Sequence, residues 1–138
     1  MIEKFNGIIY LIIFIIHFAA YAFYAFKCVF ATKAFVDQYG MGDGAAIMTR
    51  FFGSIFIGSV LMALYIMFIR PAGLEGSWAF FNLIFLQNLV LFFVNIFSHR
   101  ISTLGVNEKT SIEGIIAPGI LTILSAILCY GLADKIYI

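Results

Sequence analysis

The sequence has 138 residues, of which 64% are hydrophobic and 11% are charged, and its formal net charge is +1. Soluble globular domains carry roughly 25% charged residues, so this composition excludes an ordinary soluble domain and predicts a polytopic membrane protein of one domain. Because the charge is nearly balanced and no basic cluster is present, a nucleic-acid partner is excluded as well.

Four segments are long and apolar enough to cross a bilayer, which takes about 20 residues of helix. Lipid cannot satisfy free backbone groups, and the segments lack the alternation of barrel strands. We therefore predict an all-α membrane fold, a four-helix transmembrane bundle with short loops. The expected helices cover about residues 8–35, 45–69, 78–98 and 112–134.

The first apolar segment carries its polar groups on one side. Placed at 100° per residue, His17, Tyr21 and Tyr24 fall on a single stripe. His17 is the one ionisable side chain near the middle of this segment. Since residues 27–38 contain neither Gly nor Pro, we expect the helix to continue to about Phe35.

The second segment contains two pairs of small residues, Ser54 with Gly58 and Ser59 with Ala63. Small residues four apart let transmembrane helices approach closely. This pattern predicts that the helix is a packing interface within the bundle or between copies of the chain.

The start of the second segment also carries a family resemblance. Arg50-Phe51-Phe52-Gly53 through Gly58 resembles the R-x-x-G and small-residue pattern of DoxX-like small four-helix membrane proteins. The resemblance is confined to this helix. It implies the four-helix architecture rather than a particular activity.

The third and fourth segments each present a polar face. Asn88 and Asn95 lie on one side of the third helix, and Thr122 and Ser125 lie on one side of the fourth. When the helices are aligned by their depth in the bilayer, four polar residues fall near its middle, namely His17, Asn88, Thr122 and Ser125. Gly58 is expected to leave room beside them. The candidate binding residues are His17, Tyr21, Asn88, Asn95, Thr122 and Ser125.

Two interpretations of this midplane layer stay open. It is either a hydrogen-bonded core that fixes the register of the helices, or a site for a small polar solute, a lipid or quinone headgroup, or a proton on His17. A carboxylate metal site is not expected, because the apolar segments lack acidic residues. We expect no cofactor, although a bound lipid is compatible with the layer.

Charged residues gather at the level of the first and third loops. We expect Lys27, Arg50, Arg100 and Glu113 to lie near the lipid headgroups, where Arg50 and Glu113 could pair. Thr110 and Glu113 also have the spacing of a capping box. The first and third loops carry five Lys or Arg residues against three at the other end, which favours both termini outside the cytoplasm.

The functional expectation is a structural or accessory subunit that self-associates or joins a larger membrane complex. One alternative is a small transporter or channel that uses the midplane layer as the path of a solute or proton. A second alternative is a lipid, quinone or cofactor binder centred on His17. No serine elbow, C-x-x-C or H-E-x-x-H motif indicates an enzyme.

Overall fold

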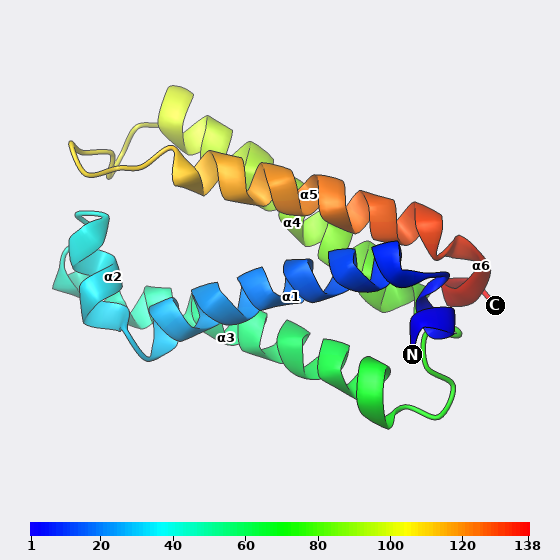
Figure 1. The fold of residues 1–138 in the computed structure, drawn as a ribbon. Coiled ribbons are helices and arrows are strands. Elements are labelled where there is room, and N and C mark those ends of the chain that lie inside the picture. Colours follow the sequence, from blue (N-terminus) through cyan, green and yellow to red (C-terminus); the bar gives the residue numbers. More distant parts are fainter.

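The computed structural model describes all 138 residues as helices and connections, with no strand. In chain order the elements are η1 (Ile2–Phe5), α1 (Ile8–Val29), α2 (Thr32–Gln38), η2 (Asp43–Ala45), α3 (Ala46–Leu64), the π-helical turn η3 (Tyr65–Ile69), α4 (Trp78–Arg100), α5 (Glu113–Gly131) and α6 (Ala133–Ile136). Figure 1 shows four long helices lying along one another.

The four long helical segments confirm the all-α prediction. Ile8–Val29, Asp43–Ile69, Trp78–Arg100 and Glu113–Gly131 are each long and apolar enough to cross a membrane, with mean hydropathies between 1.9 and 2.2. Most of the large apolar side chains on these helices point outward rather than into the bundle. A molecule of this kind fits a membrane protein, because water is a poor solvent for such a surface.

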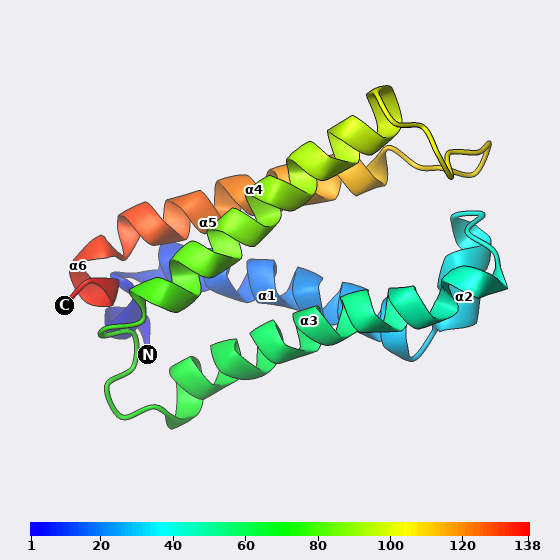
Figure 2. The ribbon, with the colours of Figure 1, turned by 180° about the vertical axis from the view of Figure 1, so that it is seen from behind.

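The long helices form two antiparallel pairs, α1 with α3 and α4 with α5. The two pairs contact each other mainly through α1 and α5. Figures 1 and 2 show the pairs close together at the end that holds both termini and separated at the end that holds α2. At the closed end, Phe5, Leu132 and Ile136 are fully buried. The Asn6 amide donates to the Gly131 carbonyl oxygen at 3.1 Å and to Asp134.

The first helix differs from the expected continuous span to Phe35. The helix ends at Val29. Two residues later the backbone of Ala31 is not helical, with φ −112° and ψ 35°, and α2 begins at Thr32. The Thr32 hydroxyl donates to the carbonyl oxygen of Cys28 at 2.8 Å, and this local bond competes with continuation of the helix. As a result α2 turns across the open end of the bundle (Figure 1).

The two glycines of α3 have different surroundings. A Cβ atom at Gly53 would lie 2.7 Å from Cys28 Cβ and from Val29 Cγ2, so this glycine lets α1 and α3 touch. A Cβ atom at Gly58 would meet nothing within 4 Å. Gly58 and Ser54 are exposed on the outer face of α3, so Gly58 does not make room beside a midplane layer. The expectation about Gly58 was wrong because the helix is rotated to place Gly53 inward.

The second small pair points toward the bundle. Ala63 is 2% exposed and Ser59 is half-buried. The α3 helix therefore packs on α1 through Gly53 and Ala63, while Ser54 and Gly58 remain on the outside.

Candidate functional site

Four of the predicted midplane residues meet in the middle of the bundle. The Tyr21 hydroxyl donates to Asn88 Oδ1 at 2.8 Å, and Asn88 Nδ2 donates to His17 Nε2 at 2.9 Å. Asn88 Nδ2 also lies 3.4 Å from Ser125 Oγ. We call His17, Tyr21, Asn88 and Ser125 the central cluster. All four are between 0 and 2% exposed.

Asn88 is the hub of this cluster. Its amide group bonds with side chains from α1 and α5, and Nδ2 also lies 3.4 Å from the Leu121 carbonyl oxygen. Ser125 donates to the same carbonyl oxygen at 2.7 Å. Since His17 Nε2 accepts a hydrogen bond, the neutral ring carries its proton on Nδ1. The Nδ1 atom is buried and has no hydrogen-bond partner.

Two other candidates do not join the central cluster. Thr122 donates within its own helix to the Pro118 carbonyl oxygen at 2.7 Å, and Asn95 Nδ2 donates within its own helix to the Leu91 carbonyl oxygen at 2.8 Å. Thr122 lies next to Ser125, whose hydroxyl contacts the Thr122 carbonyl oxygen at 3.1 Å, but the Thr122 hydroxyl is satisfied by its own helix backbone.

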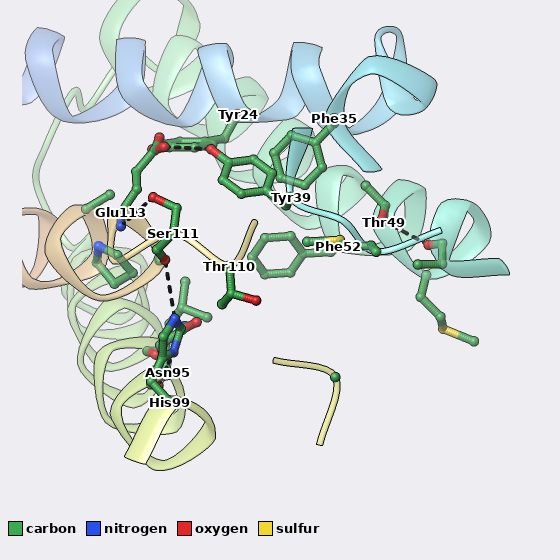
Figure 3. A pocket seen from close by; sticks show the side chains of 18 of the residues that line it. Tyr24, Phe35, Tyr39, Thr49, Phe52, Asn95, His99, Thr110, Ser111 and Glu113 are labelled. Carbon is green, nitrogen blue, oxygen red and sulfur yellow. Dashed lines mark hydrogen bonds between the residues drawn. The ribbon is translucent and has the colours of Figure 1, made fainter. Parts of the chain in front are cut away.

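A second cluster lies toward the open end of the bundle and was not predicted. Both oxygens of the Glu113 carboxylate accept tyrosine hydroxyls, from Tyr24 at 2.5 Å and from Tyr39 at 2.6 Å. Figure 3 shows the two tyrosines turned toward the carboxylate. We call Tyr24, Tyr39 and Glu113 the loop-side cluster. The sequence placed Tyr24 on the polar stripe of α1, but no pattern joined Tyr39 to Glu113.

The predicted partners of Glu113 are replaced in the structure. Arg50 does not pair with Glu113, because its Nε donates to the Thr32 hydroxyl at 3.2 Å. The Glu113 backbone N–H is capped by the Ser111 hydroxyl at 3.1 Å rather than by Thr110. The bend after α1 explains the first difference, since it holds Arg50 beside Thr32 and brings Tyr39 to the start of α5.

The other expected headgroup-side charges lie around this end without touching the carboxylate. The Lys27 ammonium lies 5.6 Å from the centre of the Tyr39 ring and donates to Gln38 Oε1 at 3.1 Å. Arg100 is exposed at the end of α4. The ion pairs of the chain join Lys33 to Asp37 and to Asp43, away from Glu113.

The electrostatics of the loop-side cluster favour neutral tyrosine beside ionised glutamate. Burial raises the pKa of Tyr39 above its ordinary value, and its hydrogen bond to Glu113 raises the pKa further. A tyrosine that donates to a carboxylate is held in its protonated form, because a tyrosinate there would face a second negative charge.

A partly open cavity of about 460 Å³ lies next to the loop-side cluster, between the two helix pairs. Its walls are mainly apolar, with Phe35, Phe52, Phe56, Leu91, Pro118 and Leu121 among them. Polar groups gather at one end, where Glu113, Asn95 and His99 line it (Figure 3). The volume falls within the range of about 300–1,000 Å³ that is typical of small-molecule pockets.

The cavity does not reach the central cluster. None of the four central residues lines it, whereas Phe56 and Leu121 do. The Phe56 ring packs edge-on against Tyr21, with ring centres 4.6 Å apart, and the Leu121 carbonyl oxygen accepts from Ser125. Phe56 and Leu121 thus lie between the buried amide network and the cavity.

No protein family, curated protein or solved structure matches this chain. The resemblance of residues 50–58 to the DoxX-like proteins therefore stays a prediction. No three His, Cys, Asp or Glu side chains are grouped as metal ligands.

Proposed function

We propose that this chain is an integral membrane protein that binds a small amphipathic molecule in the cavity between its two helix pairs. The observation that supports the proposal most directly is the cavity of about 460 Å³, with apolar walls and one polar end. Ligand pockets typically combine an apolar lining with a few polar groups that fix orientation. The proposal moves the binding site from the expected location at His17 to the space beside Glu113.

The central cluster supports a stabilising role rather than a transport role for His17. Its side chains bond to one another, are almost completely buried and do not line the cavity. Interhelical hydrogen bonds of this kind contribute about 0.6–2 kcal/mol each in membrane proteins. We propose that the cluster sets the register between α1, α4 and α5, so that the cavity keeps its shape.

The binding proposal can be tested by photolabelling in lipid nanodiscs with an aliphatic diazirine probe, followed by peptide mapping. We expect label on Phe52 and Ala117, which line the cavity. The Ala117→Phe variant fills the space and should reduce labelling of Phe52 several-fold. Ala79→Phe adds the same ring on the exposed face of α4 and should leave the labelling unchanged. Equal labelling of Phe52 in all three proteins would refute the proposal.

Self-association is a second candidate, and the outer face of α3 favours it. Ser54 and Gly58 are exposed there with open space beside Gly58, which is the arrangement that lets a second helix approach. A homo-oligomer, or a complex with another membrane protein, would bury this face. Gly58→Leu should lower the mass measured in nanodiscs if copies associate through it, and a strictly monomeric parent protein would refute self-association.

We further propose that both termini lie outside the cytoplasm. They lie at the same end of the bundle (Figure 1), and the opposite end carries the larger number of Lys and Arg residues. A C-terminal alkaline phosphatase fusion should be active and a C-terminal green fluorescent protein fusion dark; the reverse result would invert the orientation.

A further inference from the structure

The polar end of the cavity carries a single carboxylate. Glu113 is the only acidic residue among those that line the cavity, and no Lys or Arg lines it. His99 also lies there, but both of its ring nitrogens are close to backbone carbonyl oxygens, 2.7 Å from Asn95 and 3.3 Å from Ser111. The lining therefore offers one carboxylate and no side chain that forms an ion pair with it.

The Glu113 carboxylate is held in place but keeps acceptor capacity. Each oxygen accepts one tyrosine hydroxyl, whereas an ionised carboxylate has about four lone-pair sites in total. Neutral hydroxyl donors orient the group without cancelling its charge. The Lys27 ammonium donates to Gln38 and does not line the cavity.

The aromatic residues beside the carboxylate can also face a cation. Phe35 and Tyr39 line the cavity, and the Lys27 ammonium lies 5.6 Å from the centre of each ring. Ring faces at this distance attract cations through their quadrupole. The polar end of the cavity thus combines a carboxylate with aromatic rings that lie near a cation.

Resting on the function proposed above, we propose that the ligand is an amphiphile with a single cationic ammonium head, which binds Glu113 while its apolar body extends toward Phe56 and Leu121. An amine head would donate to the free lone pairs of the carboxylate. A carboxylate or phosphate head would bring a second negative charge next to Glu113 in an apolar environment, where like charges repel strongly. The site therefore selects a cationic amphiphile over neutral or anionic ones of equal length.

The test compares three probes of equal chain length, dodecylamine, dodecanol and dodecanoate, on the full chain in phosphatidylcholine nanodiscs. Empty nanodiscs give the partition background, and displacement of the aliphatic diazirine label from Phe52 gives occupancy. We expect dodecylamine to bind about tenfold more tightly than dodecanol, as one charge-assisted hydrogen bond allows, and dodecanoate to bind most weakly.

Variants separate the role of the carboxylate from that of the cavity. Glu113→Gln should remove the preference for dodecylamine while dodecanol still binds. Glu108→Gln removes a negative charge from the exposed part of the same connection and should keep the preference. If Glu113→Gln fails to fold, the parent protein and a His99→Gln variant are both titrated to acidic pH, because His99 lines the same end of the cavity. Protonation of the Glu113 carboxylate should remove the preference in both proteins.

The outcomes distinguish the two proposals. Equal binding of dodecylamine and dodecanol, or an unchanged preference in Glu113→Gln, would overturn the cationic selection while the cavity remains a binding site. No displacement by any of the three probes would overturn both. Loss of the preference in Glu108→Gln to the same extent would show that surface charge, rather than Glu113, attracts the amine.

Discussion

The central cluster and the loop-side cluster join the same two helix pairs but have different surroundings. His17, Tyr21, Asn88 and Ser125 are covered on all sides and satisfy one another almost completely. Tyr24, Tyr39 and Glu113 form an equally compact network, yet that network borders a cavity. The difference arises because the helix pairs converge at the termini and diverge toward α2 (Figures 1 and 2).

This comparison shows that polarity in an apolar bundle does not by itself mark a binding site. A buried amide network can serve only to join helices, because every polar group must find a partner where water is excluded. The loop-side cluster differs in having a charge without an ion pair beside open space. Mutations at the central cluster should therefore affect stability, and those at the loop-side cluster should affect binding.

The largest effect is expected for Asn88→Leu. The substitution leaves Tyr21 and His17 without their partner, and orphaned buried polar groups cost about 1–3 kcal/mol each. We expect a loss of about 2–4 kcal/mol in the free energy of unfolding, measured by circular dichroism during denaturation. Unchanged stability, or a selective loss of amphiphile binding in folded protein, would remove the distinction between the clusters.

Gly53→Ala tests the packing on which both clusters depend. The added Cβ would lie 2.7 Å from atoms of Cys28 and Val29, and overpacking of this kind typically costs about 1–3 kcal/mol. In the dissociated monomer Gly58→Ala is the matched control, since it adds the same methyl group in open space and should improve helix propensity by up to about 1 kcal/mol. Thermal unfolding of both variants checks the contrast, and equal effects would contradict it.

A smaller effect is expected for His17→Leu. Asn88 Nδ2 would still have Ser125 Oγ and the Leu121 carbonyl oxygen nearby, each at 3.4 Å, and the unpartnered Nδ1 would be removed. We expect a loss of about 1 kcal/mol or less, as for a single net hydrogen bond. A loss equal to that of Asn88→Leu would mean that His17, not Asn88, is the hub.

The smallest effect concerns Tyr39 and alkaline pH. Burial and Glu113 raise the pKa of Tyr39, so the folded protein holds this proton more tightly than the unfolded chain. The resulting stabilisation is complete below the ordinary tyrosine pKa of about 10 and is lost as the pH rises through the raised pKa of the folded state. The tyrosinate absorbance of Tyr39→Phe should differ from that of the parent protein only above about pH 10. A difference at lower pH would contradict this assignment.

The sequence by itself determined the class of fold and the central cluster. Hydropathy marks four helices long enough to span a membrane, because the length of an apolar helix is set by local composition. The helical period placed Tyr21 on the same stripe as His17, and helical rise placed His17, Asn88 and Ser125 at one depth. Thr122 was predicted at the same depth, but its hydroxyl bonds to its own helix backbone, which periodicity cannot reveal.

The tertiary structure alone decided the rotation of α3, the bend after Val29 and the loop-side cluster. Gly53 rather than Gly58 faces α1. The sequence could not reveal this, because both glycines lie in similar small-residue patterns and only packing against Cys28 and Val29 distinguishes them. Tyr39 reaches Glu113 across 74 positions of sequence because the first helix ends at Val29 and α2, which begins at Thr32, turns toward α5. Contacts between distant segments depend on the relative placement of whole helices, which short sequence patterns do not encode.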